Sequence, residues 1–541
     1  MRARNSLAAL ALLLALGACS RGPSPTDPAA LPANAKVLLR GAGQEPDSLD
    51  PQKARSVEAQ RILRDVCEGL TLLDKSASPA PGTASEWSVS ADGRHYTFHL
   101  RPDARWSNGD RVVAADYVAG LRRLVDPATA SQYAQVVSVI ANANEIVSGK
   151  KPADTLGVAA PDERTVTIDL TAPAVYLPSL LSHPSTCPVH RTTLAQHPDT
   201  FARAGVMVSN GAFRLAQWSQ GSQVLLVRNR YYWDNAANHL DAVRYLPISD
   251  ENAELTRYRA GALQITTTVP RGQYDWIKAN LGGQLHSSPL LNTYFYGFNL
   301  DRPPFKNNAP LRRALSLVID REKLANLVLR TGELPAYGWI PPGVHAYSEQ
   351  SFDYRNTPLS ERIAAARRLY AQAGYSAAKP LHFELRYNSG EVHDKVALAV
   401  AAMWKEALGV DVRLTSEEFK SLLQDIDAGT VEMFRSGWAG DYNDAYTYAQ
   451  YFTTGFGINM PHYHSAEYDS LVNAAAAEAD AQKRGELLES AERVLLRDHP
   501  FIPLYFYAAN HMVQPEVSGW YENVMNVVYS KDLALKGPQG P

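Results

Sequence analysis

The sequence predicts an α/β protein with mixed β-sheets and more than one domain. Short runs of strand-forming residues, such as Thr165–Leu170 and Gln223–Val227, alternate along the chain with amphipathic helical patterns. The clearest helical patterns, with apolar residues recurring every three or four positions, span Leu311–Thr331 and Val396–Leu408. A longer helical region rich in Ala, Glu and Leu runs from Asp469 to Leu496. At 541 residues the chain is too long for one hydrophobic core, so we expect two or more domains.

The composition indicates a well-packed globular protein rather than a nucleic-acid-binding one. A formal net charge of −3 provides no excess of basic side chains for a phosphate backbone. Hydrophobic residues make up 45% of the chain, which contains 27 Tyr and 9 Trp. Tyrosine suits an adaptable binding surface, although ordinary packing in a tyrosine-rich core accounts for the excess equally well.

The N-terminus has the pattern of a bacterial lipoprotein signal. Arg2 and Arg4 precede an apolar run, Leu7–Leu16, that is too short to span a membrane as a permanent helix. The run ends in Leu16-Gly17-Ala18-Cys19, which resembles a lipobox, so residues 1–18 are expected to be a signal peptide and Cys19 the lipidated first residue of the mature protein. A standard secretory signal followed by an unrelated cysteine is the alternative.

The residues after Cys19 predict a flexible tether at the cell envelope. Residues 19–35 are rich in Pro, Ser and Ala and show no apolar period, as is typical of a linker. We therefore expect the protein at the periplasmic face of the envelope of a Gram-negative bacterium, attached to the membrane through lipid on Cys19. Ser20 replaces the aspartate usual for inner-membrane retention, so attachment to the inner or the outer membrane stays open.

The other two cysteines fit an oxidising compartment. Cys67 and Cys187 remain once Cys19 is lipidated, and a disulfide between them is one expectation. Two buried free thiols are the alternative, because the sequence does not show whether their Cα atoms approach closely.

The segment Met433–Asp444, MFRSGWAGDYND, combines three side chains suited to a peptide ligand. Arg435 offers a guanidinium fork for a carboxylate, Trp438 an aromatic wall, and Asp441 a carboxylate for an ammonium group. A peptide carries these two charges at its two ends. The alternative is a strand end where the two charges pair with each other.

Besides the segment above, a set of motifs follows in fixed order along nearly the whole chain from Lys36 to the C-terminus. These motifs are Gln44–Pro51, Cys67–Leu70, Asp92–Arg101, Trp106–Gly109, Val208–Gly211, Tyr245–Ile248, Tyr258–Gly261 and Leu315–Arg321. The ordered set resembles the extracellular solute-binding proteins of family 5, especially its oligopeptide-binding members. The resemblance implies a two-lobed periplasmic binding protein fold of the class II type, with an extra domain and mixed β-sheets.

The same resemblance implies a discontinuous first domain. Domain I is expected at residues 36–68, 190–292 and 510–541, domain II at 69–189 and domain III at 293–509. It also implies that the lobes move about a hinge and close around the ligand.

The resemblance assigns roles to individual residues. Asp441 would bind the peptide ammonium, while Arg435 and His393, in the Tyr387–His393 segment, would bind the C-termini of peptides of different length. Tyr133 and Tyr507 would face the ligand, and Trp438 would line a side-chain pocket. The alternatives are a structural salt bridge for Arg435, a solvated position at a helix start for His393, and core packing for the aromatic residues.

Four positions depart from the oligopeptide-binding pattern. Asn292 and Ala439 replace a pair of cysteines, Ile426 replaces an arginine and Phe419 replaces a tryptophan. One pocket is therefore expected to be less cationic and differently shaped, which affects side-chain preference more than peptide binding itself.

The sequence as a whole predicts a binding protein rather than an enzyme. It lacks the Gly-x-Ser-x-Gly, His-Glu-x-x-His, P-loop and Cys-x-x-Cys patterns of common enzyme classes. We expect His462 and His464, two positions apart, to be surface residues rather than metal ligands. We expect a monomeric substrate-binding lipoprotein of an ABC peptide importer, with an oligopeptide ligand, permease partners, no nucleic acid, no cofactor and no metal. The alternatives are a receptor for cell-wall (murein) peptides or another small solute, such as a nickel chelate or heme, and an envelope hydrolase.

Overall fold

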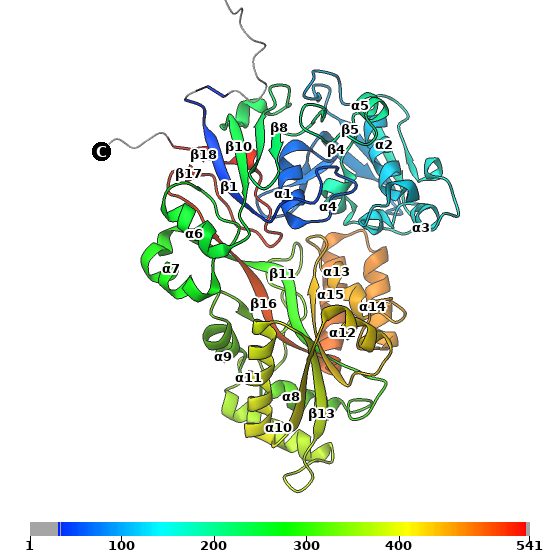
Figure 1. The fold of residues 1–541 in the computed structure, drawn as a ribbon. Helices are drawn as coiled ribbons and strands as arrows, with labels where there is room; N and C mark the ends of the chain where they lie inside the picture. Colours follow the sequence, from blue (N-terminus) through cyan, green and yellow to red (C-terminus); the bar gives the residue numbers. More distant parts are fainter. Residues whose placement is uncertain (1–30, 33, 537–541) are drawn as a thin grey trace, which may run out of the picture.

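The chain forms two lobes connected by two long strands (Figure 1). The computed structural model describes residues 31, 32 and 34–536, so the expected signal peptide, Cys19 and most of the tether lie outside the described residues. Within that part of the chain, no helix is long and apolar enough to cross a membrane. The upper lobe in Figure 1 contains two four-stranded sheets side by side, and the lower lobe contains the largest sheet.

The first part of the upper lobe is assembled from segments far apart in the sequence. Its four-stranded sheet has the order β1-β10-β9-β8, with β1 parallel to β10 and the other pairs antiparallel. Its core cluster includes Leu38, Ile62, Phe213, Leu226, Val513 and Leu533. The C-terminal segment therefore packs against the N-terminal one. The elements are β1 (Val37–Gly43), α1 (Val57–Val66), α5 (Arg191–Gln196), β8 (Phe213–Ser219), β9 (Gln223–Arg228), β10 (Ala242–Pro247), α6 (Glu251–Arg259), α7 (Tyr274–Leu281), β17 (Val517–Ser518) and β18 (Ala534–Leu535).

The second part of the upper lobe is a sheet of order β4-β5-β7-β6 packed against α2. The alternation in β7 buries Val166 and Ile168 completely and leaves the intervening threonine half-buried, as expected for a strand with one face toward a core. A disulfide joins Cys67, which caps α1, to Cys187 beyond α4, with Cα atoms 6.2 Å apart. The elements are β2 (Thr71–Leu73), β3 (Pro79–Pro81), β4 (Ala84–Val89), β5 (His95–Leu100), α2 (Ala114–Val125), α3 (Ala143–Val147), β6 (Val158–Ala159), β7 (Thr165–Asp169) and α4 (Leu177–Leu180).

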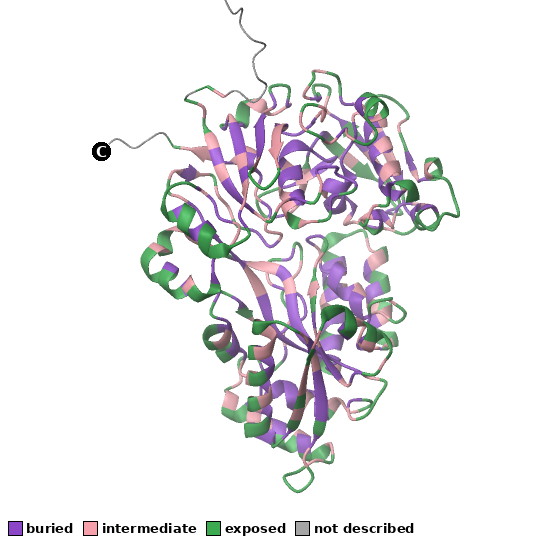
Figure 2. Cartoon of the chain, in the orientation of Figure 1, coloured by how far each residue is buried: buried purple, intermediate pink, exposed green. Residues whose placement is uncertain are grey.

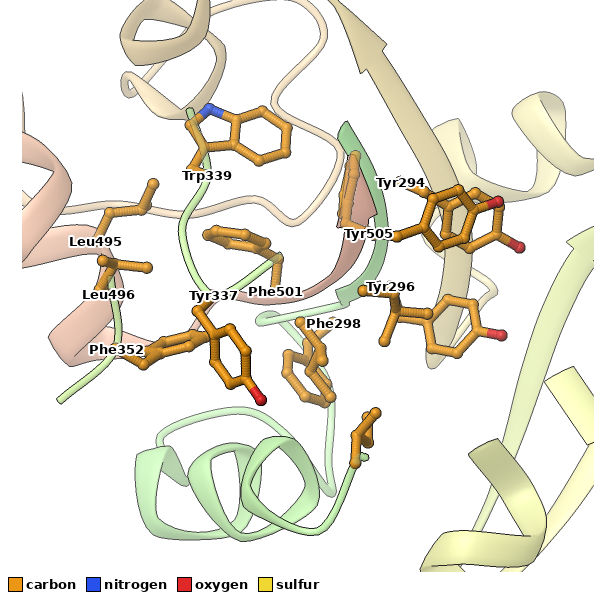
Figure 3. Close-up of a cluster of buried hydrophobic side chains, with 14 of the residues drawn as sticks. Tyr294, Tyr296, Phe298, Tyr337, Trp339, Phe352, Leu495, Leu496, Phe501 and Tyr505 are labelled. Atoms are coloured by element: carbon orange, nitrogen blue, oxygen red, sulfur yellow. The ribbon is translucent and has the colours of Figure 1, made fainter. Parts of the chain in front are cut away.

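The lower lobe is built on a six-stranded mixed sheet of order β12-β16-β11-β15-β13-β14. Its core is aromatic: Trp339 lies edge-on to Phe295 at 5.1 Å and packs on Phe501 at 5.0 Å, and Figure 3 shows this cluster. Burial follows the sheet and the inner helix faces, while the outer helix faces are exposed (Figure 2). The elements are β11 (Leu285–Phe298), α8 (Ala309–Leu317), α9 (Arg321–Lys323), β12 (Leu334–Pro335), α10 (Leu359–Gln372), β13 (His382–Asn388), α11 (Glu391–Leu408), β14 (Asp411–Glu417), α12 (Phe419–Asp427), β15 (Met433–Ala439), α13 (Tyr446–Ala449), α14 (Ala466–Ala477), α15 (Ala481–Asp498) and β16 (Phe501–Met512).

The two lobes are joined through β11 and β16, which pair with each other and run from one lobe into the other (Figure 1). The expected boundaries at 292/293 and 509/510 fall inside these strands, so continuous strands connect the lobes. Their pairing is irregular between Pro289 and Thr293, where regular ladder bonds are interrupted. We propose the division into domains I, II and III with the boundaries expected from the sequence.

The local predictions are mostly confirmed, with one correction. Thr165–Leu170 and Gln223–Val227 correspond to β7 and β9, and Val396–Leu408 lies within α11. Gly409 caps the end of α11 in the left-handed conformation, with φ of 72°. The single helix expected at Leu311–Thr331 is wrong: α8 ends at Leu317, and the Asp320 carboxylate caps a new turn by accepting a hydrogen bond from the Lys323 N–H at 2.9 Å.

The helical region at Asp469–Leu496 consists of two helices, α14 and α15. Glu478 adopts an extended conformation after α14, and Asp480 then caps α15 by accepting from the Lys483 N–H at 2.9 Å. Apolar residues recur at helical spacing on both sides of the break because the two helices pack against the same core.

Candidate functional site: the cleft between the lobes

The candidate site lies along an edge of strand β15 that is largely free of strand pairing. It pairs with β11 along its whole length, but its pairing with β13 is limited to Met433 and Phe434. From Arg435 to Ala439 the second edge of β15 has no strand partner among the described residues. Backbone N–H and C=O groups along this edge are therefore available to an extended ligand.

Arg435 lies at one end of this edge in a cage of polar and aromatic groups. Its Nη1 donates to Asn388 Oδ1 at 2.9 Å and its Nη2 donates to Tyr507 Oη at 2.8 Å. The guanidinium lies over the Tyr294 ring, 4.5 Å from its centroid, and its Nε is buried without a partner. No carboxylate pairs with Arg435 in the described part of the chain. Its half-buried positive charge therefore remains available to an anion.

His393, in the first turn of α11, belongs to the same group. Its Nδ1 lies 3.2 Å from Tyr294 Oη, and its half-buried ring packs against that tyrosine. Burial and the neighbouring Arg435 charge lower the pKa of His393 to about 4. The ring is neutral at pH 7 and can take part in a ligand contact through hydrogen bonding rather than charge.

Asp441 lies just beyond the other end of the strand. Its carboxylate has no hydrogen-bond or ion-pair partner among the described residues, and only its backbone N–H is engaged, with Thr447 Oγ1 at 3.4 Å. The residue is exposed to solvent, yet the surrounding protein partly desolvates the carboxylate and raises its pKa. Next to it, the Trp438 indole N–H donates to the Thr447 carbonyl at 2.9 Å, which fixes the ring beside the carboxylate.

Both lobes contribute to a cavity of about 430 Å³ at the Asp441 end of the strand. Tyr133 and Tyr176 come from the upper lobe, and Trp438, Asp441 and Tyr442 from the lower lobe. Tyr176 and Tyr442 stack across the junction with centroids 4.6 Å apart, and Tyr133 is held by a hydrogen bond from its hydroxyl to the Arg55 carbonyl at 3.3 Å. The volume lies within the range of roughly 300–1,000 Å³ typical of small-molecule sites.

The expected site residues thus form two groups. Arg435, His393 and Tyr507 lie together, and Asp441, Trp438 and Tyr133 line the cavity. Arg435 and Asp441 are six positions apart in the chain, which limits their Cα separation to about 20 Å. The alternative in which Arg435 and Asp441 pair with each other is wrong, because neither has an ion-pair partner in the described part of the chain.

The departures from the family pattern have clear positions. Asn292 and Ala439 are direct cross-strand partners in β11 and β15, where a pair of cysteines would also be neighbours. Ile426 is buried in the core of the lower lobe, and Phe419 is exposed at the start of α12. Neither lines the cavity beside Asp441.

Sequence reasoning missed four residues of the site: Tyr294, Asn388, Tyr176 and Tyr442. Asn388 lies in the Tyr387–His393 segment and Tyr442 directly follows Asp441, so both could have been found from those motifs. Tyr294 lies in the aromatic run of β11, a pattern equally typical of a buried strand. Tyr176 comes from the other lobe and carries no motif signal.

The model of the family "Bacterial extracellular solute-binding proteins, family 5 Middle" matches residues 78–460. The chain belongs to this family. Its family 5 fold is the two-lobed periplasmic binding protein fold expected from the sequence.

Similar proteins bear several different names. The periplasmic oligopeptide-binding protein OppA of Salmonella typhimurium is 37% identical over 537 residues, which cover 98% of each chain. A probable deoxycholate-binding periplasmic protein, YgiS of Escherichia coli, is also 37% identical, over 521 residues that cover 95% of this chain and 97% of YgiS. The unliganded open form of the murein tripeptide binding protein MppA matches with a TM-score of 0.88 at 34% identity, covering 93% of this chain and 98% of that one.

A metal site has no evident basis in the described residues. No group of three or more His, Cys, Asp and Glu side chains there is placed to hold a metal ion. His462 lies 2.8 Å from the Asp301 carboxylate, in an exposed pair on the surface.

Proposed function

We propose that this protein is the substrate-binding component of an ABC peptide importer and binds oligopeptides in the cleft between its lobes. The observation that carries the proposal is a cation and an anion, each without a counter-charge, at the two ends of one free strand edge. Arg435 is half-buried, and the protein around the exposed Asp441 carboxylate partly removes its hydration. Charges that lose hydration without gaining a partner are costly, so two of opposite sign indicate a ligand that supplies both partners.

A peptide in extended conformation matches each part of this site. Its ammonium would pair with Asp441, its carboxylate with Arg435, and its backbone with the free edge of β15 from Arg435 to Ala439. Because the two Cα atoms are at most about 20 Å apart, the site suits peptides of up to about six residues between the charged groups. Backbone and terminal contacts are independent of the side chains, so one site can accept many sequences.

A receptor for murein peptides is the second candidate function. It is favoured by the likeness to the open form of the murein tripeptide binding protein. A deoxycholate-type ligand fits less well, because a steroid carboxylate could pair with Arg435 but would leave Asp441 without a cation. The family is one of solute-binding proteins, and we propose a binding role without catalysis.

Lipid attachment through Cys19 and delivery to permease subunits complete the proposal. The lipobox pattern at Leu16–Cys19 supports an anchor at the periplasmic face of the envelope, with the protein acting as a monomer. Cys19→Ser should move the protein from the membrane fraction to the soluble periplasmic fraction. Recovery of wild-type protein whose N-terminus carries no lipid would contradict the anchor while leaving ligand binding untouched.

Calorimetry with a ligand panel tests the proposed function. Unmodified tri- to hexapeptides, a murein tripeptide and deoxycholate would each be titrated into ligand-free protein. We expect the unmodified peptides to bind, with heats that saturate at one peptide per protein. Preferential binding of the murein tripeptide would support the second candidate, and binding of deoxycholate with no binding of any peptide would refute the proposal.

A further inference from the structure

The cavity beside Asp441 is lined mainly by apolar and aromatic side chains. Its volume is about 430 Å³. The upper lobe contributes Val136, Val139 and Leu180, and the lower lobe contributes Trp438, Phe456 and Ile458. Ile458 is 38% exposed, so it offers apolar surface that a ligand could cover.

Charged groups are rare in the lining. Asp441 is the single acidic or basic side chain among the described residues that line the cavity; the other polar members are tyrosines, Gln135, Ser138 and Gln450. The polar atoms of two aromatic members are already engaged, because the Trp438 N–H donates to the Thr447 carbonyl and the Tyr133 hydroxyl donates to the Arg55 carbonyl. These two rings can present their apolar faces to a ligand.

The position of Asp441 determines what enters the cavity. In a peptide, the ammonium group and the first side chain branch from the same carbon atom. An ammonium held by Asp441 therefore places the first side chain within a few bonds of a carboxylate that itself lines the cavity. The rest of the peptide would run away from the cavity, along the free edge of β15 toward Arg435.

We propose that this cavity receives the side chain of the first peptide residue and selects large apolar or aromatic side chains at that position. The inference rests on the proposed function, since it requires the peptide ammonium at Asp441. A Phe or Leu side chain would lose contact with water among Val139, Leu180 and Ile458, whereas an alanine would leave most of the space unfilled. An acidic side chain would lose its hydration beside a carboxylate of the same sign.

Tetrapeptides that differ only in their first residue test the proposal. The series Phe-, Leu-, Ala-, Lys- and Glu-Ala-Ala-Ala would be titrated into the full chain by calorimetry. Phe and Leu should bind about tenfold to hundredfold more tightly than Ala, as expected for burying a large apolar side chain, and Glu should bind most weakly. Lys carries a second cation that competes for Asp441, so its affinity should also fall below that of Leu.

The variant Ile458→Ser tests whether the preference for a large apolar first residue arises in this cavity. It should reduce the ratio of Phe to Ala affinity at least threefold, while Leu327→Ser, an exposed leucine of the same lobe outside the cavity, should leave that ratio unchanged. Affinities within threefold across the wild-type series, or an unchanged ratio in Ile458→Ser, would overturn the inference while peptide binding itself stands. A failure of every peptide in the series to bind would overturn the proposed function and this inference with it.

Discussion

Removing the Asp441 carboxylate should weaken peptide binding by about two orders of magnitude. No cation in the described part of the chain pairs with this group, so no neighbouring residue takes over its role when it is deleted. Breaking a buried ion pair by removing one partner costs about 3–5 kcal/mol. Because Asp441 is exposed, we take the lower end, about 3 kcal/mol, which corresponds to roughly a hundredfold in Kd.

A double-mutant cycle isolates this interaction. Wild type and Asp441→Ala would be titrated by calorimetry with Leu-Ala-Ala-Ala and its N-acetylated form. Each change alone should weaken binding by a similar factor, and both together should cost clearly less than the sum, since they remove one shared contact. Fully additive losses, or acetylated peptide binding to wild type as tightly as free peptide, would refute the role of Asp441.

The pH dependence of binding follows from the same group. Burial raises the pKa of Asp441, so its ligand-free carboxyl takes up a proton at a higher pH than an exposed aspartate. The affinity for a free ammonium should therefore fall as pH decreases through this raised pKa, and Asp441→Asn should flatten the profile. The raised folded-state pKa also means that ionisation lowers stability as pH rises, so Asp441→Asn should raise the melting temperature of the ligand-free protein at pH 7.

Three further predictions concern the other end of the site, the hinge and the disulfide. Arg435→Met should weaken binding of free tetrapeptides at least tenfold by calorimetry but affect C-amidated ones far less, and equal losses for both would contradict a carboxylate contact. Saturating peptide should lower the radius of gyration in small-angle scattering, because the irregular pairing at Pro289–Thr293 allows the lobes to close; an identical profile would exclude closure. The double variant Cys67→Ser/Cys187→Ser should unfold at a lower temperature, with a loss of about 4–5 kcal/mol expected for a loop of 120 residues, and an unchanged melting curve would show that the bond does not stabilise the fold.

Local sequence patterns predicted the elements of the fold but not all of their ends. The alternation in β7 and the apolar stripe of α11 are set by periods that each segment shows alone. The break after Leu317 depends on the Asp320 cap, and helical periodicity continues through it because the same core covers both sides. The division into lobes came from the family resemblance, since periodicity does not reveal which distant segments share a core.

The two charged residues at the ends of the site could be predicted from the sequence because they lie in one motif. Arg435 and Asp441 are six residues apart, and a single strand with its following loop places both. The cavity as a whole could not be predicted, because Val136, Val139 and Leu180 come from the other lobe and meet Ile458 only in the tertiary structure. Tyr294 could not be predicted for a different reason. The aromatic pattern of β11 is the same whether a given ring faces the core or the cleft.

The identity of the natural ligand is the most direct test of the central claim. The protein would be purified from its native envelope without denaturation, and its bound ligands would be released with acid and identified by mass spectrometry. We predict a mixture of peptides of about three to six residues, with free amino and carboxyl termini and large apolar first residues. A single non-peptide solute, or peptides with blocked termini at full occupancy, would contradict the account.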